Sequence, residues 1–271
     1  MPSQDPNLPS YKKPPLNEVV CGVQFVPFPG FRSTHFGRFA DRLQARYPKT
    51  EDREPLADVY EGEQGPQVKD ELITLQMPPL RRVFYVDPTG NYLLQLQPSR
   101  FLSNWRKQKD SDAYPRFTAA FDRFKEGWRD LLEFAKAEGI GQPQVNQYEL
   151  SYINHIPESS VPFPEGMQHY LRFFSWANIR SSQVLRVPRS GTFRFQFALS
   201  GHQGTLHVTV NHGKRMTDQK GILLVDLTAR GPARFDWSDI DEWFATAHAT
   251  IVNGFTDMTT PEAHEIWGRE R

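Results

Sequence analysis

The polar string at residues 104–106 contains the residue types that could most readily form a site. Asn104, Trp105 and Arg106 stand side by side before Lys107, and they follow the pattern NYLLQLQ, which predicts a strand. Amide, indole and guanidinium groups hydrogen-bond, stack and neutralise charge, so the string is either a binding site or only a strand ending. Successive side chains of a strand alternate between its faces. We therefore expect a buried Trp105, with Asn104 and Arg106 pointing together to the polar side.

Four arginines lie close together in the second half of the chain and could form a basic stripe. With exposed aromatic side chains beside it, such a stripe would bind nucleic acid. The chain as a whole carries 32 Lys and Arg against 32 Asp and Glu, which argues against a general electrostatic attraction to nucleic acid. Nucleic-acid binding therefore stays the alternative function. The stripe consists of Arg180, Arg186, Arg189 and Arg194.

One carboxylate, Asp226, stands inside the apolar strand pattern LLVDLT. Burying a charged group is costly unless the group is paired. Asp226 is therefore expected either to face solvent or to pair with an arginine such as Arg186 or Arg194.

The sequence contains no recognisable catalytic, cofactor or metal motif. It has no phosphate-binding glycine loop and no G-x-S-x-G elbow. The only cysteine, Cys21, shares the apolar phase of a predicted strand, so we expect an inert core thiol. His202, His207 and His212 are five residues apart, an odd spacing that puts the last two on opposite faces of a strand. We predict no metal, no cofactor and no enzymatic activity.

The periodicity of the apolar residues predicts a mixed α+β chain. Period-two patterns indicate strands, three-to-four spacing indicates helices, and an acidic stretch with Pro and Gly at 49–71 indicates a long exposed loop. Ser238 is the expected N-cap of one helix, and Thr260 of another. The expected strands are 17–28, 72–77, the hairpin 81–97, 147–157, 182–188, 192–200, 205–210 and 221–230, and the expected helices are 33–48, 113–138, 167–177, 238–255 and 261–267.

The order of these elements predicts two similar halves packed as one globular unit. An extended proline-rich arm, residues 1–15, precedes a first half at 16–142 and a second half at 143–271. Each half is expected to be a curved antiparallel sheet covered by a long helix, and the two sheets are either separate or joined. This order resembles the saddle of the TATA-binding protein or a helix-grip fold, an analogy that carries no function.

Composition and hydropathy predict a cytoplasmic protein. The 271 residues are 38% hydrophobic and 24% charged, which suits a globular chain with a sizeable core. The first residues carry five prolines and no apolar segment, so we expect no signal peptide. No stretch approaches the roughly 18 apolar residues of a membrane helix, and we expect no membrane partner.

Several strings, in this order, resemble a sporadically distributed bacterial family of unknown function. They are YKKPPLNEVVCGVQF, FLSNWRKQKDSDAYPRF, YELSYINHI, GILLVDLTAR and AHATIVNGFTDMTTPEAHEIWG. The family's start, two prolines, two residues, an acid and a small apolar residue, fits Pro14, Pro15, Glu18 and Val19. Its Asn-Trp-Arg and Tyr-x-Asn strings fit Asn104 to Arg106 and Tyr152 with Asn154. The tail departs at Ala247-His248, where the family usually has Leu-His.

The resemblance implies a bacterial or phage-borne protein of defence islands and mobile elements, with no assigned mechanism. It also selects five candidate binding residues, Glu18, Asn104, Arg106, Tyr152 and Asn154. They either join the two halves or line a polar pocket between them that binds a ligand or partner segment. We predict a non-catalytic binding or regulatory protein, such as an immunity or antitoxin-type component, whose partner is another protein, encoded nearby or a second copy of the chain.

Overall fold

The computed structural model describes residues 8–59, 61, 81–158, 160–175, 184, 188, 190–215, 219–233 and 238–271. In this part of the chain, four α-helices, two short 3-10 helices and nine strands form an α+β fold, as predicted. The strands are β1 (Leu16–Val26), β2 (Lys49–Arg53), β3 (Arg82–Val86), β4 (Tyr92–Gln97), β5 (Arg100–Arg106), β6 (Gln144–Pro157), β7 (Gly191–Ala198), β8 (Thr205–Lys214) and β9 (Gly221–Pro232). The helices are α1 (Ser33–Leu43), α2 (Phe117–Ala137), α3 (Ile240–Met258), α4 (Pro261–Ile266), η1 (Glu165–His169) and η2 (Ser200–His202).

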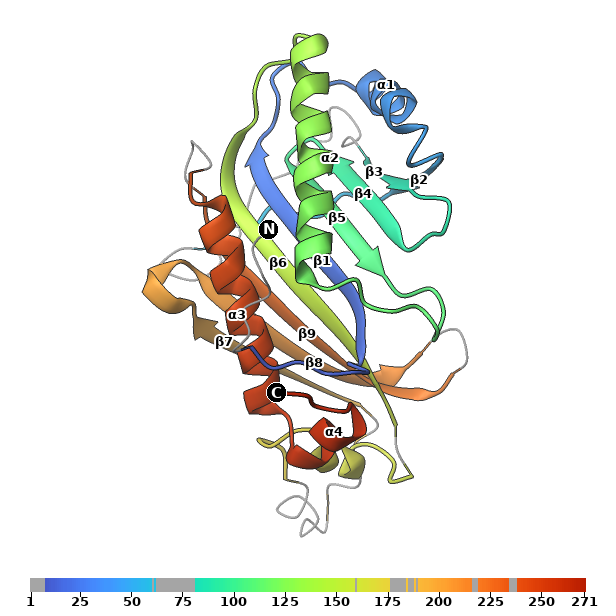
Figure 1. Cartoon of the computed structure of the whole chain (residues 1–271), viewed down its shortest axis with the longest axis vertical. Helices are drawn as coiled ribbons and strands as arrows, with labels where there is room; N and C mark the ends of the chain where they lie inside the picture. Colours follow the sequence, from blue (N-terminus) through green and yellow to red (C-terminus); the bar gives the residue numbers. More distant parts are fainter. Residues whose placement is uncertain are drawn as a thin grey trace.

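The nine strands form a single antiparallel sheet in the order β2-β3-β4-β5-β1-β6-β9-β8-β7. Strands before and after residue 142 therefore join in one sheet, through the ladder between β1 and β6. Helices α2 and α3 lie on the same face of this sheet, as Figure 1 shows. We call that side the helix-covered face and the opposite side the open face.

The core lies between the sheet and the long helices because one phase of each central strand is apolar. On β1, the predicted set Val19, Cys21, Val23 and Phe25 is at most 1% exposed. The α2 side of this layer includes Trp128, whose ring lies 5.7 Å from that of Phe25. Burial raises the pKa of Cys21 well above its ordinary value, which fits the predicted inert thiol.

The open face is crossed by a segment for which the sequence predicted only an exposed loop. Within the predicted loop 49–71, Lys49–Arg53 forms the edge strand β2. Residues 54–59 and 61, here called the crossing segment, then pass over the sheet. The backbone N–H groups of Leu56, Val59 and Glu61 donate to side-chain carboxamides on β4, β1 and β6 at 3.0, 3.1 and 3.2 Å. The acceptors are the Oε1 atoms of Gln97, Gln24 and Gln147.

Several further predictions of elements differ from the structure, and two lie outside the described residues. Residues 100–106 form a separate strand, β5, which the expected strands did not include, and α2 begins at Phe117 instead of residue 113. The expected helix 167–177 is the shorter 3-10 helix η1, and the N-cap residue of α3 is Asp239 instead of Ser238. The expected strand 72–77 lies outside the described residues, as does most of 182–188. Thr260 does cap α4, since its Oγ1 accepts from the N–H of Ala263 at 3.2 Å.

The described part of the proline-rich arm packs against the C-terminal segment. Lys12 and Lys13 donate their backbone N–H groups to the carbonyls of Gly268 and Trp267 at 3.1 and 3.0 Å. The hydroxyls of Tyr11 and Thr256 are 2.8 Å apart, which ties the arm to α3. None of the described helices is both long enough and apolar enough to cross a membrane.

Candidate functional site

The structure places the five predicted binding residues on two different faces of the sheet. Glu18 lies directly opposite Ile153 in the β1–β6 ladder, so both side chains point to the open face. Tyr152 and Asn154, the neighbours of Ile153 on β6, must then point to the helix-covered face. The five residues therefore do not line one pocket, which was one of the two predicted alternatives, because alternate residues of β6 face opposite ways. The other alternative, that they join the two halves, stays a prediction.

On the open face, the ladder registers align charged residues in one row across six strands. Cross-strand partners point to the same face, so the row follows directly from the pairing. Its ends are basic, and its middle holds two carboxylates separated by one isoleucine. In strand order the row is Arg194, Thr209, Asp226, Ile153, Glu18 and Arg106.

A hydrogen-bonded chain of side chains leads from β3 to the Glu18 carboxylate. Arg82 Nη1 donates to Gln95 Oε1 at 2.9 Å, and Gln95 Nε2 donates to Asn104 Oδ1 at 2.8 Å. Asn104 Nδ2 then donates to Glu18 Oε1 at 2.6 Å. Both polar ends of the Asn104 amide are thus occupied, which fixes the position of the carboxylate.

The outcome for the Asn-Trp-Arg string matches the strand geometry. Trp105 is buried on the helix-covered face, 3% exposed, with its ring 5.5 Å from that of Tyr114. Arg106 lies on the open face and donates from Nε to the carbonyl of Gly90 at 3.0 Å, in the turn before β4. The string therefore holds the local hairpin together and also forms one end of the charged row.

The other carboxylate of the row, Asp226, has no arginine partner within ion-pair distance among the described residues. Its Oδ1 accepts from the Thr228 hydroxyl at 2.7 Å, and Thr228 is itself 2.7 Å from the Ser151 hydroxyl. Arg194, one of its two predicted partners, lies two strands away in the row, and the other, Arg186, is outside the described residues.

Burial raises the pKa of both Glu18 and Asp226 above the ordinary carboxyl value. The Asn104 amide and the Arg106 charge partly oppose this shift at Glu18, while the charge of Asp226 adds to it. At Asp226 the Thr228 hydroxyl is the main opposing group. Among the described residues, neither carboxylate forms an ion pair. The charges of Arg106 at Glu18 and of Arg230 at Asp226 act from a longer distance. A desolvated anion with no cation at contact distance favours an incoming one.

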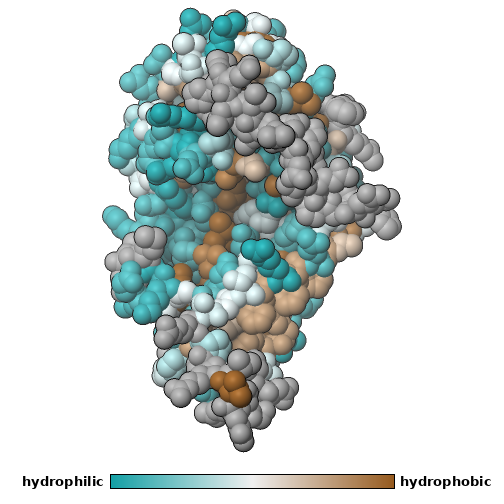
Figure 2. All heavy atoms as spheres, turned by 180° about the vertical axis from the view of Figure 1, so that it is seen from behind, coloured by the Kyte–Doolittle hydropathy of each residue, from teal (hydrophilic) through white to brown (hydrophobic). Residues whose placement is uncertain are grey.

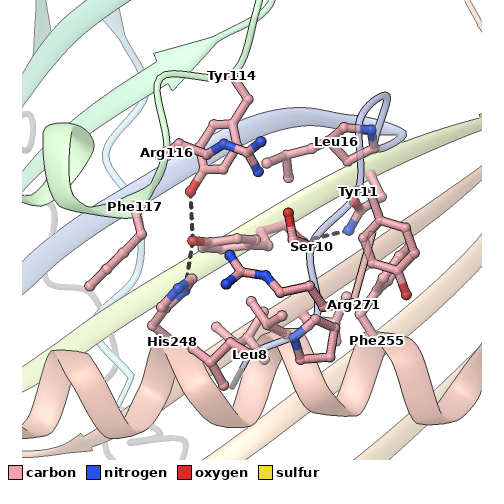
Figure 3. A pocket seen from close by; sticks show the side chains of 17 residues that line it. Leu8, Ser10, Tyr11, Leu16, Tyr114, Arg116, Phe117, His248, Phe255 and Arg271 are labelled. Carbon is pink, nitrogen blue, oxygen red and sulfur yellow. Dashed lines mark hydrogen bonds between the residues drawn. The ribbon is translucent and has the colours of Figure 1, made fainter. Parts of the chain in front are cut away.

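On the helix-covered face, Tyr152 lines a small cavity of about 70 Å³ that is partly open to solvent, drawn in Figure 3. Its hydroxyl is 2.8 Å from that of Tyr114 and 2.9 Å from Nδ1 of His248, so the three groups form one hydrogen-bonded chain. The ring of Phe117 stacks on the His248 imidazole at 4.1 Å. Burial lowers the pKa of His248 to about 4, and the histidine is therefore neutral at pH 7.

Asn154 also lines this cavity, and its side-chain amide hydrogen-bonds to a backbone carbonyl. Asn154 Nδ2 donates to the carbonyl of Val225 on β9 at 3.2 Å. The sequence prediction missed Tyr114 and His248 as members of the same cavity. Both residues stand in the strings that carry the family resemblance, but no local pattern showed that these two strings meet on one face of the sheet.

Of the predicted basic stripe, the structure describes only Arg194, which lies exposed on the edge strand β7. Arg180, Arg186 and Arg189 lie outside the described residues. His207 lies on the open face, 2.6 Å from a Glu61 carboxylate oxygen, whereas His212 lies on the other face beside Phe163. These two histidines therefore point to opposite faces, as their odd spacing predicted.

No protein-family model matches the sequence, and the search of curated proteins finds no match either. The functional interpretation therefore depends on the geometry of the two faces.

Proposed function

We propose that this is a non-catalytic binding protein that receives an extended, basic segment of a partner protein on the open face of its sheet. The observation that carries the proposal is the pair of half-buried carboxylates, Glu18 and Asp226, in the middle of the charged row. Their raised pKa values mean that the folded protein holds two anions at a cost. A lysine or arginine side chain placed between them would offset that cost.

The open face already binds one extended segment, namely the crossing segment of the chain itself. Glutamine side chains on three strands accept hydrogen bonds from its backbone. The charged row lies six residues farther along β1, from Gln24 to Glu18, or about 20 Å at the usual rise of a strand. On β8 the crossing segment comes closer to the row, because His207, two residues before Thr209, is 2.6 Å from a Glu61 carboxylate oxygen. A second extended segment on this face would therefore lie alongside the first.

The shape of the open face suits such a segment. Figure 2 shows this side of the molecule hollowed along its middle. The floor of the hollow is hydrophobic, and the surface on either side of it is hydrophilic. Val20 on β1 and Ile153 on β6 supply apolar side chains to this face. A bound segment would bury its apolar side chains there and direct its basic side chain to the carboxylates.

Nucleic acid is the less favoured partner for this face. Two carboxylates in the middle of the row repel a phosphate backbone, and the basic residues Arg106 and Arg194 stand only at the ends of the row.

The localisation, the family and the fold likeness of this protein stay predictions from the sequence. It comprises a cytoplasmic bacterial protein of a defence or mobile-element locus, its membership of the family it resembles, and the likeness to a saddle-shaped or helix-grip fold.

The test uses labelled ten-residue peptides of threonine and valine with one central lysine, and the same peptides with glutamine in its place. Fluorescence anisotropy should show tighter binding of the lysine peptide, weakening as salt is added. The variant Glu18→Gln/Asp226→Asn should lose about tenfold in affinity, since a charge-assisted hydrogen bond contributes roughly 1.5–3 kcal/mol.

The matched control is Asp257→Asn, which removes an exposed carboxylate from α3, on the other face. This variant should bind the lysine peptide as the parent does. Equal affinity of the parent for the lysine and glutamine peptides would contradict the proposal. Unchanged lysine-peptide binding by the double variant would contradict it as well.

A further inference from the structure

We propose that the cavity on the helix-covered face is a second, separate site that binds a small monocarboxylate of about three to six non-hydrogen atoms. This inference is independent of the proposed function, because the cavity and the charged row lie on opposite faces of the sheet. It is based on the backbone of one arginine, on the charge and size of the cavity, and on its hydrogen-bonding groups.

Arg116 has a backbone conformation that glycine alone adopts easily. Its φ of 74° and ψ of 158° lie in the region that an L side chain strains to occupy. The residue directly precedes α2, and its side chain lines the cavity. Strained residues persist where the surrounding structure holds them, and they gather at ligand sites. Glycine would relieve the strain at this position but would remove the guanidinium group from the cavity. A role of that group in binding would explain why the residue is arginine.

The charge of the cavity favours an anion. Among the described residues that line it, two are arginines and none is Asp or Glu. The nearest carboxylate that contacts a described lining residue is that of Glu270, which accepts from the Ser10 hydroxyl at 2.9 Å. Figure 3 shows Arg116 and Arg271 reaching toward the middle of the cavity from opposite sides, near Ser10. A guanidinium group binds a carboxylate through two parallel hydrogen bonds, which gives both charge and geometric selectivity.

The size and the walls of the cavity restrict the rest of the ligand. A single water needs roughly 10–15 Å³ of such space, so a cavity of about 70 Å³ admits only a few non-hydrogen atoms. Much of the lining is aliphatic or aromatic, from β1, β9 and α3, and suits a short hydrocarbon tail. These apolar lining residues are Leu16, Leu227, Ile251, Val252 and Phe255.

The hydrogen-bonded chain of Tyr114, Tyr152 and His248 can leave one hydroxyl proton, that of Tyr114, available to donate to the ligand. With His248 neutral and its proton on Nδ1, His248 donates to Tyr152, and Tyr152 donates to Tyr114. The hydroxyl proton of Tyr114 is then left to donate to a bound anion. With the proton on the other ring nitrogen, the chain runs the opposite way and Tyr114 donates to Tyr152. A carboxylate in the cavity would select the first arrangement.

The experiment is isothermal titration of the purified chain with sodium propionate and, as the neutral analogue of the same shape, propionamide. The parent should bind propionate about tenfold more tightly than propionamide, the usual effect of a charge-assisted hydrogen bond. Arg116→Ala and Arg116→Gly should both lose this preference. Arg116→Gly should melt at a higher temperature than Arg116→Ala, because glycine relieves the backbone strain.

Two further variants complete the test. Arg129→Ala removes an exposed arginine of the same helix and should retain the preference for propionate. Tyr152→Phe removes the central hydroxyl of the chain and should weaken propionate binding while leaving propionamide binding nearly unchanged. The proposal is overturned if the parent does not bind propionate, or if Arg116→Ala binds propionate as tightly as the parent.

Discussion

Asn104 shows at the scale of single residues how one amide organises charge on the open face. It accepts a hydrogen bond from Gln95 and donates one to Glu18, and it is 3% exposed. Asn104→Ala would remove the acceptor of Gln95 Nε2 and the donor to Glu18 Oε1. We expect a loss of about 1–3 kcal/mol in the free energy of unfolding, measured by urea denaturation.

The control for this change is Asn253→Ala, an exposed asparagine on α3. It should alter the free energy of unfolding by no more than about 0.5 kcal/mol. Equal stabilities of Asn104→Ala and the parent would mean that water replaces the lost hydrogen bonds without cost.

The carboxylates of the charged row predict an unusual dependence of stability on pH. Because the folded pKa of Glu18 and of Asp226 is raised, the folded state holds their protons more tightly than the unfolded state does. Their contribution to stability is complete below the unfolded pKa, near pH 4, and it is lost as the pH rises through the folded pKa. Glu18→Gln/Asp226→Asn should therefore be more stable than the parent at pH 7.

This gain should be measured by thermal melting of both proteins between pH 3.5 and pH 8. The difference should shrink toward the lower end of this range, where the parent carboxyls are protonated too. A double variant that is less stable than the parent at pH 7 would show that the carboxylates stabilise the fold. If Glu18 and Asp226 form a binding site, the double variant should gain stability and lose peptide binding.

For single residues, the sequence showed which side chains of one strand share a face, but not which residues of other strands lie beside them. Strict alternation was enough to separate the buried Trp105 from Asn104 and Arg106. The same rule, applied to β1 and β6 together, would have separated Glu18 from Tyr152 only if the register between these strands had been known. Register depends on pairing across more than 100 residues, which no local pattern contains.

At the scale of elements, the long helices are fixed by large aromatic side chains. Trp128 on α2 is 5% exposed and Trp243 on α3 is 2% exposed, with its indole N–H donating to the carbonyl of Gln203 at 2.9 Å. Trp128→Ala and Trp243→Ala should each lower the free energy of unfolding by about 3–5 kcal/mol in urea denaturation. Melting within a degree or two of the parent would show that the core adjusts around the missing ring.

The crossing segment makes a prediction about hydrogen exchange. The backbone N–H groups of Leu56 and Val59 bond to glutamine side chains, whereas most strand amides bond to other backbone groups. Gln24→Ala together with Gln97→Ala should expose both amides to exchange and leave the protection of β1 and β4 intact. Unchanged protection at Leu56 and Val59 would mean that other contacts hold the segment in place.

Element by element, the apolar periodicity predicted the long helices and most of the central strands, since they bury a continuous face. It did not predict the central strand β5 as a separate element. It missed β2, whose sequence KTEDR is entirely polar, with four charged residues of five, and is mostly exposed at the sheet edge. An edge strand with two solvated faces has no apolar phase for a sequence to display. The crossing segment was missed because its stability comes from side chains of strands elsewhere in the chain.

At the scale of the whole molecule, one sheet separates two proposed sites that share a strand. Peptide binding on the open face and carboxylate binding on the helix-covered face are tested with different probes and different variants. Ile153 belongs to the open face, while Tyr152 and Asn154 belong to the cavity, and all three stand within three consecutive positions of β6.

Because both sites use β6, an insertion in this strand affects both sites, and its effect depends on whether the number of added residues is odd or even. Adding one residue before Tyr152 would turn Tyr152 toward the open face and Ile153 into the core, so both sites and part of the core would be lost together. Adding two residues would keep every later side chain on its own face and shift it by one pleat. Insertions or deletions within this strand should therefore be tolerated, if at all, in even numbers only.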